Sequence, residues 1–220
     1  LIRSTQWVDD DIDSTVRPWH DPYSKQFVAR IDAISAAILE NNEPSLQVLR
    51  NLNDGRTITI PPATDDGQPK DVSRNPKDPF RVPVEVRLHY MVGNHDWFYH
   101  LPGLSYNQIR RQVVEAMNLA NDPRQPFPHE PEEAPALQAL LAQHQVYARH
   151  GDIYDPDNFE FAAGRNASSL GDAVVVELLN RFPSEVRRRL GDELPAACLN
   201  GLKELDNVRP MLVVPIWINS

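Results

Sequence analysis

The feature that most constrains the fold is a strand-like segment that ends in a polar turn and is followed by a helical pattern. Residues 84–92 (Val-Glu-Val-Arg-Leu-His-Tyr-Met-Val) alternate apolar and polar side chains, as a half-buried β-strand does. The segment ends at residues 93–96 (Gly-Asn-His-Asp), and helical periodicity follows through residues 105–117. A strand, a turn and a helix in succession predict an α/β fold.

A second short strand is expected at residues 145–149, and it ends at His150-Gly-Asp. Because residues at strand ends of α/β folds meet in one crevice, the two turns are candidates for a common site. Asn94 offers a carbonyl oxygen and His150 an imidazole nitrogen to a metal ion. His95 is left to act on substrate, and Asp96 could fix its tautomer and raise its basicity. A lone histidine after a strand is more often structural, but two such turns favour a functional site.

The remaining pattern is mainly helical. Ser24 is expected to cap a helix whose apolar residues share one face (Phe27, Ile31, Ile34 and Ile38). Further helices are expected near residues 46–53, 137–141, 173–182 and from residue 184, and further strands at residues 56–60 and 211–217. Capping boxes are predicted at Ser105 to Gln108 and at Ser169 to Asp172.

Composition limits the classes of protein to consider. A single domain covering residues 1–220 is expected at this length, with residues 61–83 as a polar surface insertion. The net charge of −9 argues against general nucleic-acid binding. No apolar run approaches the ~18 residues of a membrane span. The single cysteine, Cys198, excludes an internal disulfide and is expected to be buried. Without a signal-peptide pattern the sequence predicts a cytoplasmic protein of undefined oligomeric state.

Residues 93–96 resemble the G-N-H-D signature of the calcineurin-like metallophosphoesterases. Members of that family place two metals at the strand ends of a β-sandwich flanked by helices, with ligand motifs in the order D-x-H, G-D-x-x-D, G-N-H-D, a lone His and G-H-x-H. His150 matches the lone His, and its H-G-D form is similar to that of lipid A precursor pyrophosphohydrolases. The resemblance therefore implies this β-sandwich fold.

The resemblance also implies a mechanism and roles for individual residues. Asn94 and His150 would bind one metal, His95 would protonate the leaving oxygen, and Asp96 would orient His95. Two divalent ions (Mn, Fe, Zn or Ni) would activate a water that attacks phosphorus. The substrate would be a phosphorylated small molecule or a phosphodiester.

The chain departs from the family pattern in the motifs that it lacks. No D-x-H precedes Gly93, no G-H-x-H follows His150, and the only G-D-x-x-D string, at residues 151–155, stands on the wrong side of G-N-H-D. Residues 1–7 look like the sequence that follows G-D-x-x-D in such enzymes. We therefore expect a central segment of the domain that lacks its N-terminal and C-terminal metal-ligand segments, and that hydrolyses phosphoesters poorly by itself.

Two alternatives stay open. The chain could be a non-catalytic binding domain on a decayed phosphoesterase fold, which the absence of the remaining motifs from the neighbouring sequence would support. A lipid-precursor pyrophosphohydrolase is a weaker alternative, because it rests on the H-G-D form alone.

Overall fold

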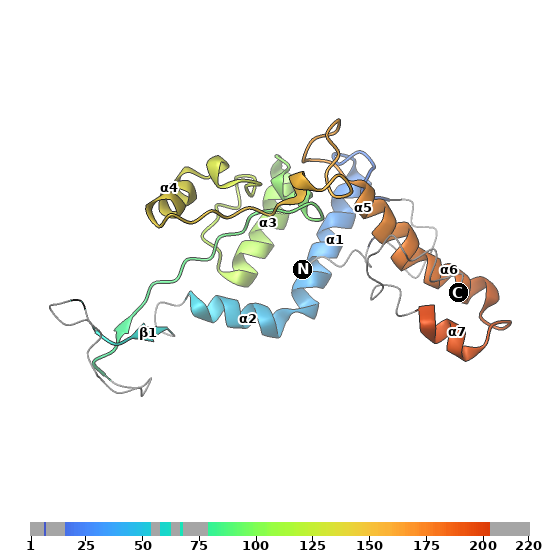
Figure 1. The fold of residues 1–220 in the computed structure, drawn as a ribbon, viewed down its shortest axis with the longest axis horizontal. Coiled ribbons are helices and arrows are strands. Elements are labelled where there is room, and N and C mark those ends of the chain that lie inside the picture. Colours follow the sequence, from blue (N-terminus) through green and yellow to red (C-terminus); the bar gives the residue numbers. More distant parts are fainter. Residues whose placement is uncertain (1–6, 8–15, 54–57, 63–66, 68–78, 203–220) are drawn as a thin grey trace. The chain divides into compact units, whose positions relative to one another are not determined.

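The computed structural model describes residue 7 and residues 16–53, 58–62, 67 and 79–202, and it is mostly helical (Figure 1). The predicted β-sandwich flanked by helices is wrong for this chain. The described residues contain two strands, β1 (Thr59–Ile60) and β2 (Val82–Pro83), which form one antiparallel pair. A sandwich needs two packed sheets, and a pair of two-residue strands provides neither of them.

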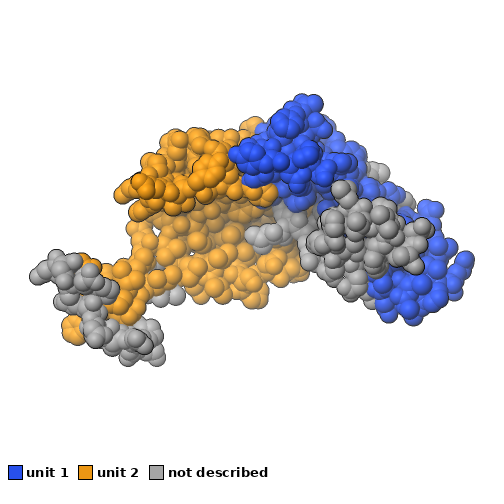
Figure 2. All heavy atoms as spheres, in the orientation of Figure 1, with its two compact units in different colours: residues 1–30, 93–97, 151–220 blue, residues 31–92, 98–150 orange. Residues whose placement is uncertain are grey.

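The chain divides into two compact units, each built from separate stretches of sequence (Figure 2). Unit 1 comprises Leu1–Arg30, Gly93–Trp97 and Gly151–Ser220. Unit 2 comprises Ile31–Val92 and Phe98–His150. The G-N-H-D turn therefore belongs to unit 1, together with residues that follow it by more than fifty positions.

Helix α1 (Lys25–Asn41) confirms the predicted apolar face. The Phe27 N–H donates to the Ser24 side-chain oxygen at 3.2 Å, so Ser24 caps the helix as expected. The apolar residues of that face are all buried (Phe27, Ile31, Ile34 and Ile38). In unit 1, Phe27 packs against Trp7 and Trp97, with ring centroids 5.5 and 6.1 Å apart. Burial of these aromatic side chains removes apolar surface from water and stabilises the core of unit 1.

Helices α2 (Glu43–Leu52) and α3 (Leu104–Met117) lie against each other in unit 2. Arg50 donates from α2 to the last carbonyls of α3, at 2.8 Å to Glu115 O and 3.3 Å to Ala116 O. A cation at these carbonyls also complements the helix dipole. The predicted capping box at Ser105 is wrong, since α3 begins at Leu104 and Gly103 is its N-cap.

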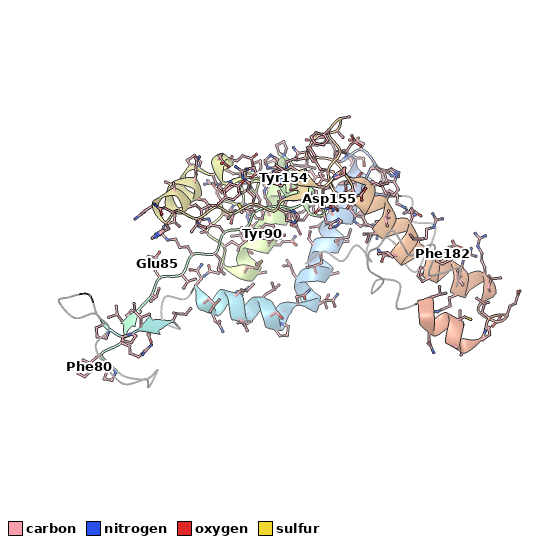
Figure 3. The ribbon with its side chains drawn as sticks, in the orientation of Figure 1. Phe80, Glu85, Tyr90, Tyr154, Asp155 and Phe182 are labelled. Atoms are coloured by element: carbon pink, nitrogen blue, oxygen red, sulfur yellow. The ribbon has the colours of Figure 1, made fainter. Side chains whose placement is uncertain are left out.

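The segment at residues 84–92 is extended but is not a strand (Figures 1 and 3). Its side chains alternate as predicted: Glu85 is exposed, for example, and Tyr90 is half-buried. At its start Val84 N–H donates to Ile58 O at 2.8 Å, next to β1. Further along, its backbone bonds to loops, with Val92 N–H donating to Pro128 O at 2.9 Å and Ala120 N–H to Leu88 O at 2.8 Å. The predicted strand at residues 145–149 is likewise irregular. The alternation predicted which side chains of residues 84–92 are more exposed, but pairing into a sheet also depends on residues far away in the sequence.

Strands β1 and β2 enclose the predicted insertion. Thr59 is opposite Pro83 and Ile60 is opposite Val82, so the chain leaves and returns at one place. Most of residues 61–83 lie outside the described residues. Of the strand predicted for residues 56–60, the described part is residues 58–60, and Thr59 and Ile60 are in β1.

Arg110 organises the core of unit 2 although it is charged. Its side chain is fully buried and donates to Tyr99 O at 2.8 Å, Leu101 O at 2.7 Å and Pro123 O at 3.1 Å. Burial lowers the pKa of the Arg110 guanidinium to about 10. A single side chain thus satisfies three carbonyl groups in the loops around α3.

The other helices are short. They are η2 (Trp97–His100), η3 (Pro131–Glu133), α4 (Pro135–Gln143), η4 (Asp152–Tyr154), α5 (Leu170–Ala173), η5 (Val174–Arg181), α6 (Phe182–Leu190) and α7 (Ala196–Gly201). α5, η5 and α6 are continuous, so the predicted new start at Ser184 is wrong. Cys198 on α7 is exposed and not buried as predicted. The strand predicted at residues 211–217 lies outside the described residues. None of the described helices has the length and apolar character needed to cross a membrane.

Candidate functional site

The G-N-H-D turn is closed by its own carboxylate. Gly93 N–H donates to Asp96 Oδ1 at 2.6 Å, which ties the first residue of the turn to the last. Trp97 follows immediately and is 2% exposed, packed on Phe27. The turn is therefore held at both ends, with Asn94 and His95 between them.

His95 is paired with the carboxylate of Asp172, 77 positions further along the chain. His95 Nδ1 lies 2.8 Å from Asp172 Oδ1, and the two side chains are 38% and 5% exposed. The hydrogen bond that His95 donates to Asp172 is the main cause that raises the pKa of His95. Burial of the imidazole opposes this rise, while the negative charges of Asp172 and Asp96 add to it. The pair has the geometry of a histidine held in one tautomer by a buried carboxylate.

Helix α5 explains why Asp172 is available for this contact. Ser169 N–H donates to Asp172 Oδ2 at 2.9 Å, which confirms the carboxylate half of the predicted capping box. One carboxylate oxygen thus caps the helix and the other binds the imidazole. Asp172 thus binds the imidazole directly, while Asp96 closes the turn and acts on His95 through its charge. The orienting role predicted for Asp96 stays a prediction.

Asn94 is the most deeply buried polar residue of the turn, with 9% of its surface exposed. Its Nδ2 donates to Asn158 Oδ1 at 2.9 Å and lies 3.4 Å from His95 Nε2. The carbonyl oxygen of Asn94 is therefore the atom directed away from both neighbours. This is the atom that the sequence predicts to bind a metal.

His150 is exposed and is the last residue of unit 2, whereas Asn94 and His95 belong to unit 1. The predicted convergence of Asn94 and His150 stays a prediction. Beyond His150, Gly151 adopts a left-handed conformation with φ of 91° at the start of η4. Asp152 then forms an ion pair with Arg165 at 2.9 Å, with side chains 3% and 16% exposed. Asp152 thus has a structural partner of opposite charge.

The pair of divalent ions that the resemblance implies stays a prediction. Within the part of the chain that the structure describes, no three His, Cys, Asp or Glu side chains are grouped so that they could hold a metal ion. A bound zinc ion needs about four donors and a calcium ion six to eight. Asn94 and His150 could supply at most two donors, so a metal centre would need donors beyond these residues.

Unit 1 also has a hollow of about 390 Å³ close in sequence to the turn. Trp97, two residues after His95, lines it, and so does Ser168, which precedes the capping box at Ser169. The hollow falls within the size range of small-molecule sites. Its other principal lining residues are Pro18, Trp19, His20, Asp21 and Asn166.

Comparison of the chain with protein-family models, with curated proteins and with solved structures finds no match. The resemblance to metallophosphoesterases therefore rests on the motif residues themselves. The structure adds to them the pairing of His95 with a buried carboxylate.

Sequence reasoning missed Asp172 and Asn158 as neighbours of the turn. A signal for Asp172 was present, because a capping carboxylate has a second oxygen that can accept another hydrogen bond. No such signal existed for Asn158, which lies in an irregular stretch.

Proposed function

We propose that this chain supplies the acid–base part of a phosphoester hydrolase, with His95 as the general acid. The observation that supports this most directly is the 2.8 Å contact between His95 Nδ1 and Asp172 Oδ1. The carboxylate is almost fully buried while the imidazole is 38% exposed, so a solvent-facing group is held by a fixed one. Positioned acids of this kind contribute about 10²- to 10⁴-fold to a rate.

The proton transfer follows from this arrangement. Protonated His95 donates from Nδ1 to Asp172, which leaves the proton on Nε2 for the leaving oxygen of the ester. The Asn94 NH₂ group, 3.4 Å from Nε2, cannot accept that proton, and it can donate to Nε2 once the proton has been transferred. Asp172 stabilises the imidazolium before the transfer and fixes the neutral tautomer after it. The raised pKa of His95 increases the fraction of protonated imidazole near neutral pH.

The metal-dependent part of this proposal rests on the G-N-H-D resemblance. In that proposal Asn94 and His150 act as ligands, a phosphorylated small molecule or a phosphodiester is the substrate, and the protein works in the cytoplasm.

A non-catalytic binding domain is the second candidate. Under this alternative His95 and Asp172 have a structural role in joining the turn to α5.

The test compares three variants of the full-length gene product: His95→Ala, Asn94→Ala and His150→Ala. We expect His95→Ala to lower kcat by about 10²- to 10⁴-fold with nearly unchanged metal content. Asn94→Ala and His150→Ala should lower metal content first, and the rate as a consequence. Metal stoichiometry and phosphoester hydrolysis are measured on the same samples.

Two results would reject the proposal. A His95→Ala protein that has lost its metal would show that His95 is a ligand and not the acid. Wild-type protein without any phosphoester hydrolysis in the presence of Mn²⁺ would favour the binding domain.

A further inference from the structure

The side-chain amide of Asn94 is the end of a chain of three polar groups. Asp155 Oδ2 accepts from Asn158 Nδ2 at 2.7 Å, and Asn158 Oδ1 accepts from Asn94 Nδ2 at 2.9 Å. Asp155, labelled in Figure 3, is exposed, whereas Asn94 is buried. The chain of hydrogen bonds therefore connects the surface of unit 1 to the G-N-H-D turn.

The carboxylate decides the orientation of both amides. An ionised carboxylate only accepts hydrogen bonds, so Asn158 has to face Asp155 with its NH₂ group. The carbonyl oxygen of Asn158 then faces Asn94, and only the NH₂ group of Asn94 can bond to it. The Asn94 carbonyl oxygen is thereby turned away, whereas an isolated asparagine could adopt either flip.

We propose that Asp155 and Asn158 are positioning residues that commit Asn94 to present its carbonyl oxygen to a ligand. The ligand that such an oxygen takes is a cation or an N–H or O–H donor, and not a phosphate oxygen. That this ligand belongs to a phosphoester hydrolase rests on the proposed function. The orientation of the amides does not.

Gly171 is the third part of this arrangement. Its N–H donates to Asp157 O at 2.7 Å, which brings the start of α5 against the turn that carries Asn158. A Cβ atom at Gly171 would lie 2.8 Å from Asn158 Oδ1 and 3.1 Å from Asp157 O. Because the second contact is with backbone, an added methyl group cannot be accommodated by side-chain rotation alone. A methyl group at Gly171 would therefore displace Asn158 Oδ1, the atom that accepts from Asn94, or shift the Asp157 backbone by a few tenths of an ångström.

The test measures hydrogen exchange of side-chain amides by NMR on the full ¹⁵N-labelled chain, without metal or substrate. The Asn94 resonance is assigned from its loss in Asn94→Asp. Asp155→Asn keeps the shape of the side chain but can donate as well as accept, so it removes the constraint on Asn158. We expect exchange of the Asn94 NH₂ protons to become about 2- to 12-fold faster, the factor that one ordinary hydrogen bond contributes. Gly171→Ala should have the same effect.

Asp157→Asn is the matched control, because it removes the same charge from the same turn and the Asp157 side chain is exposed. It should leave the Asn94 resonance and its exchange unchanged. Urea unfolding of Asp155→Asn should match that of wild type, which separates an effect on orientation from a loss of stability.

The proposal is overturned if Asp155→Asn leaves Asn94 exchange unchanged, or if Asp157→Asn accelerates it equally. Since the samples contain neither metal nor phosphoester, these results reject the positioning role alone. The hydrolysis measurements on His95→Ala reject the proposed function alone.

Discussion

Replacement of Asp172 tests the contact on which the candidate site depends. Asp172→Ala removes the acceptor for Ser169 N–H and for His95 Nδ1, at 2.9 and 2.8 Å. Loss of a helix cap costs about 1 kcal/mol, and loss of a hydrogen bond to a charged group about 1.5–3 kcal/mol. Part of this is offset, because the variant no longer buries a carboxylate that is 5% exposed in the protein. We expect Asp172→Ala to lower the free energy of unfolding of unit 1 by about 2–4 kcal/mol.

Urea unfolding followed by tryptophan fluorescence is the appropriate assay. The described tryptophans, Trp7, Trp19 and Trp97, all belong to unit 1, so the signal reports on the unit that contains Asp172. Asp192→Ala serves as a control in the same unit, because Asp192 is exposed. It should change the free energy of unfolding by less than about 0.5 kcal/mol.

The reasoning is refuted if Asp172→Ala and Asp192→Ala are equally stable. An effect of Asp172→Asn as large as that of Asp172→Ala would also contradict it. An asparagine keeps one oxygen that can accept either from Ser169 or from His95, so its cost should be smaller.

Three further outcomes are expected. The pKa of His95 is raised above its ordinary value of 6.5. The stability from the contact with Asp172 is therefore fully present below pH 6.5 and is lost as pH rises through the higher pKa of the folded state. The free energy of unfolding, measured between pH 5 and 9, should fall with pH in this way in wild type and not in Asp172→Asn. Arg110→Met should destabilise unit 2 by about 3 kcal/mol, since buried carbonyls lose their donor, as measured by thermal unfolding in circular dichroism. Tyr99→Phe should cost about 1 kcal/mol in the same assay, because the Ser35 and Tyr99 hydroxyls are hydrogen-bonded at 2.8 Å and buried.

The features that were predicted correctly depend on neighbouring residues. The apolar face of α1 was predicted from apolar residues spaced three and four positions apart. The cap at Ser24 was predicted because its hydroxyl stands three residues before the backbone N–H that donates to it. The carboxylate of the Ser169 capping box was predicted for the same reason. Spacing and capping within a few residues were therefore enough to predict α1 and the start of α5.

The features that were predicted wrongly depend on distant residues. Residues 84–92 have the alternation of a strand, yet in the described chain their backbone bonds to loops near Ala120 and Pro128. Asp96 stands next to His95 in sequence, but Asp172 reaches the imidazole from 77 positions away. Sequence adjacency gave no sign of this contact, because only the fold brings Asp172 to His95.

The claim that His95 is a general acid is tested most directly by its dependence on the leaving group. The measurement compares kcat/KM of the full-length gene product and its His95→Ala variant on an alkyl phosphoester and on a nitrophenyl phosphoester. An alkoxide leaving group needs a proton and nitrophenolate does not, so we expect a fall of about 10²- to 10⁴-fold on the alkyl ester and a much smaller fall on the nitrophenyl ester. Asp172→Asn should show the same preference more weakly. An equal fall on both esters would contradict the account, because it would show that His95 does not protonate the leaving oxygen.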